Sequence, residues 1–268
     1  MFVIYKIIEK SLANRIKHRL PHIIHPSQAA FTQGRHIASS IIIAQEIIHS
    51  FNLKSWKQKA FFLKLDLAKA FDRIEWHFIV NAIKRLGFHG CFIDLIYNYS
   101  STTSLSVLIN GEPSPTFYPQ RGVRQGCPLS PYLFIVVINE LSMCLQHHSS
   151  SQNIEGITLG PNCPRIHSLL FANDLIICGQ ATIEEATGIN TILQRFCNAC
   201  GQTPNIAKSS ITFSNYTDNQ SKMAVKSSFH ISNLARNAIV IPDFKDKIRY
   251  ALYMSFRSQI SHIATNKG

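Results

Sequence analysis

Residues 168–178 have the sequence SLLFANDLIIC, in which two apolar runs flank the polar pair Asn173 and Asp174. Two short apolar runs joined by such a pair are typical of buried strands connected by a tight turn, because Asn and Asp tolerate turn geometry. Both polar side chains are therefore expected on the turn, at the rim of a sheet. By itself, the pattern favours an ordinary hairpin over a functional site.

A second apolar run, FFLKLD at 61–66, lies within a predicted strand over 60–67 and ends on Asp66. A carboxylate at the end of a buried strand must be matched by a cation, a metal ion or a proton, because an unpaired buried charge is costly. The alternative is a helix N-cap, with Asp66 opening a helix in the residues that follow. The residues alone do not separate these interpretations.

Two loops carry residues suited to an anionic ligand. The loop RGVRQGCPLSP (121–131) contains Gln125 and Gly126 and precedes a predicted helix. Glycine lets the backbone approach a ligand, Arg and Gln supply donors, and a helix start favours anions. The segment QAAFTQGRH (28–36) is similar, with Arg35 suited equally to a phosphate and to a helix-capping carboxylate.

The remaining periodicities predict helices mixed with antiparallel hairpins, which favours an α+β architecture. Helices are expected over 36–51, 74–86, 132–147 and 184–200, and a hairpin at Asn110-Gly111. The N-terminus has apolar residues at helical spacing, which predicts an amphipathic helix with a basic face. These residues are Ile4, Ile7, Ile8, Leu12, Ile16 and Leu20.

The charge balance indicates a polyanionic partner. The chain has 27 Lys+Arg against 15 Asp+Glu, a net charge of +12, which suits nucleic acid or an anionic membrane surface. No apolar run reaches the roughly 18 residues that a membrane span needs. A mitochondrial transit peptide is the alternative for the first twenty residues, and Glu9 argues against it.

The seven cysteines are scattered along the chain, which favours a reducing compartment over a disulfide framework. Cys197 and Cys200 form a lone CxxC. Structural zinc needs four ligands, so two neighbouring thiols buried on a helix are the favoured interpretation of this pair.

In this order and spacing, the segments resemble the reverse transcriptases of LINE-type (non-LTR) retrotransposons, especially those of plants. The resemblance covers about residues 5–214. The matching text is YKIIEKSLANRIK, QAAFTQGRHIASSIIIAQEIIHS, FLKLDLAKAFDRIEW, SLSVLINGEPS, RGVRQGCPLSPYLF, SLLFANDLIICG and FCNACGQTPNIAKSSITFS.

The resemblance implies two-metal phosphoryl transfer, with two Mg²⁺ ions, or Mn²⁺ in their place, held by aspartates. Asp66 would be the first metal ligand, and Asp174 would belong to the second metal-binding motif. Asn173 stands where the family has another aspartate, so one anion is missing beside two dications. Cys127 stands where plant relatives usually have Asp.

The resemblance also implies the substrate contacts. Phe71 matches an aromatic steric gate that presses against a ribose 2′-hydroxyl and so selects deoxynucleotides. Gln125 and Gly126 match a motif that packs against the nucleotide sugar and the template. Arg35 is expected to contact the triphosphate, and Lys208 matches a lysine near the active site. The implied partners are an RNA template, a DNA primer and dNTPs, with no membrane, in the nucleus or the cytoplasm.

The implied fold is a right-hand polymerase core, with an antiparallel palm sheet that carries Asp66 and Asp174 and is backed by helices. We expect partial fingers at 1–58, a palm at 59–214 and a degenerate thumb-like tail at 215–268. The rival hypothesis is a nucleic-acid-binding remnant without catalysis, which Asn173 favours. A group II intron maturase would need splicing-associated sequence after the thumb, and residues 215–268 show none.

Overall fold

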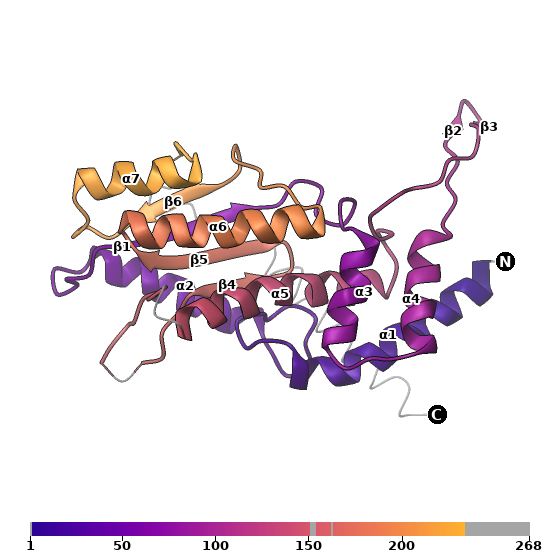
Figure 1. The fold of residues 1–268 in the computed structure, drawn as a ribbon, viewed down its shortest axis with the longest axis horizontal. Coiled ribbons are helices and arrows are strands. Elements are labelled where there is room, and N and C mark those ends of the chain that lie inside the picture. The colour runs from indigo at the N-terminus through magenta and orange to yellow at the C-terminus, as the bar shows by residue number, and fades with distance from the viewer. Residues whose placement is uncertain (1, 151–153, 162, 234–268) are drawn as a thin grey trace.

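A four-stranded antiparallel sheet forms the centre of the computed structural model, which describes residues 2–150, 154–161 and 163–233 (Figure 1). Its strands, β1 (Ala60–Asp66), β4 (Ser168–Phe171), β5 (Asp174–Gln180) and β6 (Ser210–Phe213), have the order β4-β5-β1-β6. A separate hairpin of β2 (Leu108–Ile109) and β3 (Glu112–Pro113) projects from the body (Figure 1). The helices are α1 (Phe2–Ile23), α2 (Ile37–Asn52), α3 (Trp76–Arg85), α4 (Cys91–Ser101), α5 (Ser130–Ser150), α6 (Ile183–Cys200) and α7 (Asn219–Phe229).

Strand β1 lies between β5 and β6, and helices pack on both faces of the sheet. Successive side chains of a strand point to opposite faces. Phe61 and Leu63 join a core that includes residues of α3, α5 and α6, whereas Phe62 joins a second core with α2. Burial on both faces explains why β1 is apolar almost throughout. The predicted α+β class, with an antiparallel sheet backed by helices, is confirmed.

Most of the predicted elements are present. Helices α2, α3, α5 and α6 begin and end within a few residues of the predicted bounds. Asn110 and Gly111 have φ values of 52° and 89°, the left-handed region that a tight two-residue hairpin requires. Helices α4 and α7 and strand β6 were not predicted.

The predicted stripe of α1 is only partly correct. Ile16 and Leu20 are buried, but Ile4, Ile7 and Ile8 are exposed by 68%, 62% and 44%. Successive steps of four residues advance about 40° around a helix with 3.6 residues per turn. The stripe therefore drifts off the buried face, and Ile7 lies on the side opposite Ile16.

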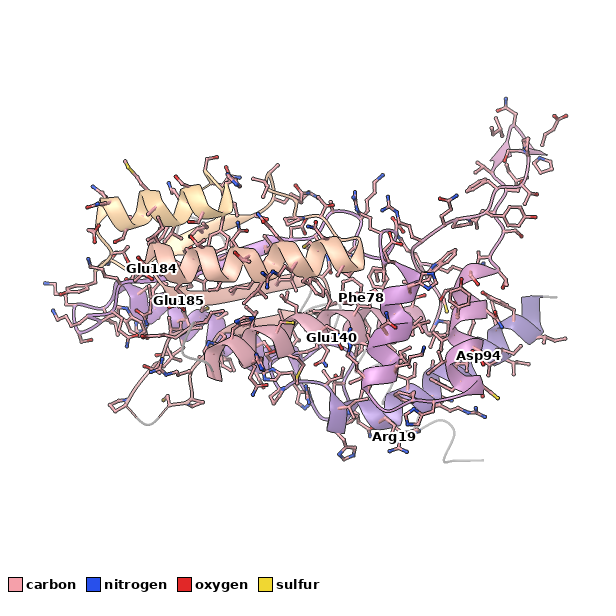
Figure 2. The ribbon with its side chains drawn as sticks, viewed as in Figure 1. Arg19, Phe78, Asp94, Glu140, Glu184 and Glu185 are labelled. Carbon is pink, nitrogen blue, oxygen red and sulfur yellow. The ribbon has the colours of Figure 1, made fainter. Side chains whose placement is uncertain are left out.

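Helix α3 is joined to α5 and α6 by two different contacts. Arg85 of α3 forms an ion pair with Glu140 of α5, and the ring of Phe78 meets Phe196 of α6 edge-on, with centroids 5.9 Å apart. Figure 2 labels Phe78 and Glu140, one residue of each contact. Together they fix the helix that directly follows the loop after β1.

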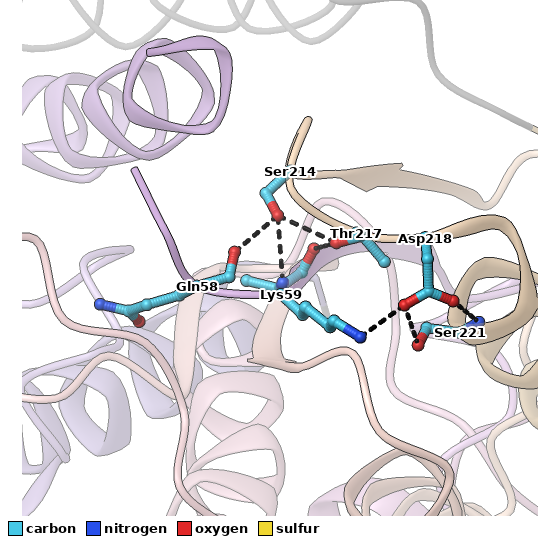
Figure 3. Close-up of polar contacts among 7 residues, drawn as sticks. Gln58, Lys59, Ser214, Thr217, Asp218 and Ser221 are labelled. Atoms are coloured by element: carbon cyan, nitrogen blue, oxygen red, sulfur yellow. Dashed lines mark hydrogen bonds and ion pairs between the residues drawn. The ribbon is translucent and has the colours of Figure 1, made fainter. Parts of the chain in front are cut away.

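Polar contacts tie the start of β1 to the connection between β6 and α7 (Figure 3). The hydroxyl of Ser214 donates to the carbonyl of Gln58 at 2.8 Å. Asp218 caps α7 by accepting from the N–H of Ser221 at 2.8 Å, and it pairs with Lys59 at 2.6 Å. The ammonium group of Lys59 and the Ser221 donors hold the pKa of Asp218 well below its ordinary value.

The predicted tail at 215–268 is only partly described. Its first part contains α7, which packs on α6, and the ring of Phe229 lies 5.6 Å from that of Phe61. The predicted thumb-like remainder lies outside the described residues. Within the described ranges, no helix is long and apolar enough to cross a membrane.

Candidate functional site

Two aspartates are paired at one end of the sheet. Asp66 is the last residue of β1 and Asp174 is the first of β5, and the two are direct partners in the antiparallel register. Directly opposed residues of such a pair have Cα atoms about 4.5–5.5 Å apart. The alternative of a helix N-cap at Asp66 is wrong, because turns follow and α3 begins only at Trp76, with Glu75 as its N-cap.

The turn between β4 and β5 consists of Ala172 and Asn173. Asp174 already pairs with Phe171, so only one of the two predicted polar residues lies in the turn itself. Ala172 has a φ of 51°, which costs a residue with a Cβ atom about 1–2 kcal/mol. Such strain at a functional turn needs support from the surroundings.

A cavity of about 630 Å³ opens beside Asp66 and Asn173. Four segments distant in sequence contribute to it: the turn after β1, the loop leading into α5, the turn between β4 and β5, and residues 205–208. Among the predicted site residues, the structure brings Asp66, Phe71, Gln125, Gly126, Asn173 and Lys208 to this cavity. The remaining lining residues are Leu67, Ala68, Lys69, Ala70, Ser130, Pro131 and Asn205.

Phe71 is held by contacts on two sides. Its ring stacks on Phe134 of α5, with centroids 4.7 Å apart and an interplanar angle of 22°. Its carbonyl accepts from the N–H of Val123 at 2.8 Å. In the same region, the amide of Gln125 donates to Asp72 at 2.8 Å. The loop before α5 and the turn after β1 therefore form one continuous wall of the cavity.

The segment after α6 braces the end of β1. Asn205 donates its N–H to the carbonyl of Asp66 at 2.8 Å, and the N–H of Asp66 donates to the hydroxyl of Ser209 at 3.2 Å. This pairing carries Asn205 and the exposed Lys208 to the cavity. Sequence reasoning missed Asn205, although it lies three residues before Lys208, at the start of the same turn.

The turn after β1 also has the properties of an anion site. Lys69 has a φ of 50°, and among the described residues the N–H groups of Lys69, Ala70 and Phe71 have no acceptor. Successive free N–H groups around a left-handed residue form a concave anion-binding nest. Lys69 and Lys208 add positive charge, and α5 begins at the cavity with Ser130, where the helix dipole favours an anion.

Arg35 lies elsewhere, and the cavity lining does not include it. Its guanidinium donates to the carbonyls of His25, Ile24 and Gln28 at 2.6, 2.7 and 2.8 Å. Burial lowers its pKa below the usual range for arginine. Arg35 thus fixes residues 24–28, and its contact with the triphosphate stays a prediction.

The donors at the sheet end suit a hard divalent cation. Asp66, Asp174 and the amide oxygen of Asn173 are oxygen ligands of the kind Mg²⁺ prefers, with one anion fewer than three carboxylates would give. In the described part of the chain, no group of three or more His, Cys, Asp and Glu residues is placed to hold a metal.

Cys197 and Cys200 are buried on α6 as predicted, and burial raises the pKa of their thiols to about 11 and about 12.

Comparison with known proteins gives consistent matches. A family model described as "Reverse transcriptase (RNA-dependent DNA polymerase)" matches residues 1–250. The "Transposon TX1 uncharacterized 149 kDa protein" of Xenopus laevis is 29% identical over 180 residues, covering 67% of this chain and 13% of that protein. The "Retrovirus-related Pol polyprotein from type-1 retrotransposable element R2" of Popillia japonica is 30% identical over 149 residues, covering 55% and 24%.

Solved structures show the same fold. Telomerase from Candida albicans, determined with a fragment of telomeric RNA, superimposes with a TM-score of 0.54 at 12% identity. The match covers 80% of this chain and 36% of the telomerase chain. The chain therefore spans only a part of each of these longer proteins.

Proposed function

Because this chain belongs to the reverse transcriptase (RNA-dependent DNA polymerase) family, we propose that its cavity is a polymerase active site. The predicted kinship with non-LTR retrotransposon enzymes is confirmed by the family match and by the relatives from the TX1 and R2 elements. The proposed reaction adds deoxynucleotides from dNTPs to a DNA primer on an RNA template. The observation that carries this proposal is the opposed pair Asp66 and Asp174, of which Asp66 lines the cavity together with Lys69 and Lys208.

Asp66, Asp174 and Asn173 are the residues that would hold Mg²⁺, or Mn²⁺ in its place. When bound, two such ions activate the primer 3′-hydroxyl for attack on the α-phosphate and offset the charge of the departing pyrophosphate. The sheet end fixes both carboxylates on rigid strands. Their spacing therefore does not depend on loop motion.

The triphosphate fits the nest at residues 69–71. The free N–H groups there, with the side chains of Lys69 and Lys208, supply donors and positive charge to one side of the cavity. Gln125 and Gly126, in the loop that continues this wall, are proposed to pack against the nucleotide sugar and the template.

Phe71 is proposed to exclude the 2′-hydroxyl of a ribonucleotide. In the Asn173→Asp background, Phe71→Ala should narrow the preference for dNTPs over rNTPs by about tenfold or more, since the rejection is steric. The measurement compares kcat/KM for one dNTP and the matching rNTP on the same primer–template. Phe71→Tyr serves as the control, because it keeps the ring and should keep the preference. Unchanged selectivity in Phe71→Ala would leave Phe71 as a core aromatic that packs on Phe134.

Nucleic-acid binding is expected whether or not the chain catalyses the reaction. The net charge of +12 should make affinity for a primer–template fall steeply as salt rises, because bound Lys and Arg residues release counterions. Fluorescence anisotropy between about 50 and 200 mM salt measures the slope, over which 6–10 phosphate contacts predict a loss of roughly 10³–10⁵ in affinity. Weak binding that hardly changes over this range would contradict the expectation.

Templated incorporation tests the assignment itself. A labelled DNA primer on RNA is incubated with single dNTPs and Mg²⁺ or Mn²⁺, using the wild-type chain and Asn173→Asp. Only the dNTP complementary to the next template base should add. Incorporation that ignores the template base would overturn the proposal, and tight binding without any incorporation would support the binding remnant.

A further inference from the structure

The side chain of Gln28 lies completely buried beneath the turn that precedes Asp174. It is 0% exposed, and its Oε1 accepts from the N–H of Ala30 at 2.9 Å and from the N–H of Ala172 at 3.4 Å. Ala172 is the turn residue with the strained φ of 51°. A residue of the N-terminal region therefore touches the backbone of the candidate catalytic turn.

The backbone around Gln28 is fixed to the same strand. Ala29 donates its N–H to the carbonyl of Leu170 at 3.0 Å, and Leu170 donates to the carbonyl of Ser27 at 2.8 Å. Residues 27–29 thus extend the sheet beside β4. On the other side, Arg35 donates to the carbonyl of Gln28 at 2.8 Å. These contacts place the Gln28 amide in one position relative to the turn.

The nitrogen of the Gln28 side-chain amide differs from its oxygen in having no hydrogen-bond partner in the described part of the chain. Nε2 of Gln28 is buried and has no partner among the described residues. A flipped amide would direct its NH₂ group at the N–H donors of Ala30 and Ala172, so the two N–H groups set its orientation. A buried donor left unmatched is unfavourable. The amide keeps this orientation in spite of the cost, so the group that matters at this position is Oε1, the acceptor for the N–H groups of Ala30 and Ala172.

We infer that Gln28 is a positioning residue for the metal-binding turn, an inference that rests on the proposed polymerase function. Its Oε1 holds Ala172 in the left-handed conformation, and this conformation sets Asn173 at the cavity and Asp174 opposite Asp66. Gln28 lies outside the residues that line the cavity, so it acts on the reaction through the turn.

Amide hydrogen exchange at Ala172 tests the inference without relying on activity. Gln28→Met keeps the size of the side chain and removes the acceptor, so exchange of the Ala172 N–H should rise by about tenfold. The matched control is Thr32→Val: Thr32 is buried in the same loop, and its hydroxyl donates to the carbonyl of Ala30 at 3.1 Å, a hydrogen bond that does not involve the turn. Equal exchange at Ala172 in both variants would overturn the inference.

A second variant covers the case in which Gln28→Met does not fold. Gln28→Glu, in the protonated form that complete burial favours, keeps an acceptor oxygen and replaces the unpartnered NH₂ group with a hydroxyl, so exchange at Ala172 should stay as slow as in the wild-type chain. Fast exchange in this variant would overturn the inference.

Catalysis provides the second readout, in the Asn173→Asp background. Gln28→Met should raise the Mg²⁺ concentration for half-maximal primer extension and lower kcat by about tenfold or more, with primer–template affinity unchanged. Thr32→Val should change neither. If the Asn173→Asp chain itself extends no primer, the proposed function fails, while the exchange experiment still decides whether Gln28 holds the turn.

Discussion

The Asn173→Asp variant should extend a DNA primer on RNA roughly a hundredfold faster than the wild-type chain, scaled from losses at metal sites. Asn173 lines the cavity at the turn directly before Asp174. Its amide can ligate a cation but carries no charge, and two dications held close together need anions to offset their repulsion. Asp is nearly isosteric with Asn and suits the same turn, so the substitution adds charge with little disturbance of the hairpin.

A matched control distinguishes the effect of a carboxylate at position 173 from the effect of one more negative charge in the cavity. Asn205→Asp places the same new carboxylate at another position in the lining of the same cavity, in a residue that pairs with the end of β1 through its backbone. It should leave extension near the wild-type rate. Single-turnover extension on homopolymer RNA, in Mg²⁺ and separately in Mn²⁺, measures all three proteins. If wild type already matches Asn173→Asp, the asparagine does not limit the activity.

The strands that carry the site were predictable from their composition. Runs such as 61–66 and 168–171 are apolar because both faces of the sheet are covered, and a carboxylate stands out at the end of such a run. The pairing of Asp66 with Asp174 was not deducible from local pattern. It depends on the register between β1 and β5, which lie more than a hundred residues apart in the chain.

The errors have equally specific causes. Asn205 belongs to a short turn whose place at the cavity comes from its hydrogen bond to Asp66, and no periodicity signals such a bond. Arg35 has the chemistry of a phosphate ligand, and the carbonyls of residues 24–28 that bind its guanidinium explain why it does not line the cavity. Ile4 and Ile7 fit a helical stripe in spacing, and the drift of that stripe becomes visible only once the buried face is known.

Asp66→Asn, made in the Asn173→Asp background, should reduce primer extension by a factor on the order of 10²–10³. Asp66 ends β1 directly opposite Asp174, so its loss removes an anion from the centre of the proposed metal site. Primer–template affinity should be unchanged, because binding depends on the basic groups of the chain. The thermal midpoint without metal should not fall, since directly opposed like charges are destabilising in a strand pair. These two readouts distinguish a lost ligand from a damaged fold.

Asp72→Asn is the control for this substitution. Asp72 is exposed, follows Phe71 and accepts from Gln125 at 2.8 Å, a bond that an Asn oxygen can still accept. It lies outside the strand pair, so its substitution should change extension little. A similar loss of extension in Asp72→Asn and Asp66→Asn would mean that the effect reflects negative charge near the cavity in general. The pairing of Asp66 with Asp174 would then not be what the reaction depends on. Unchanged extension in Asp66→Asn would remove the ligand assignment altogether, because no two-metal site at this sheet end can operate without the carboxylate of β1.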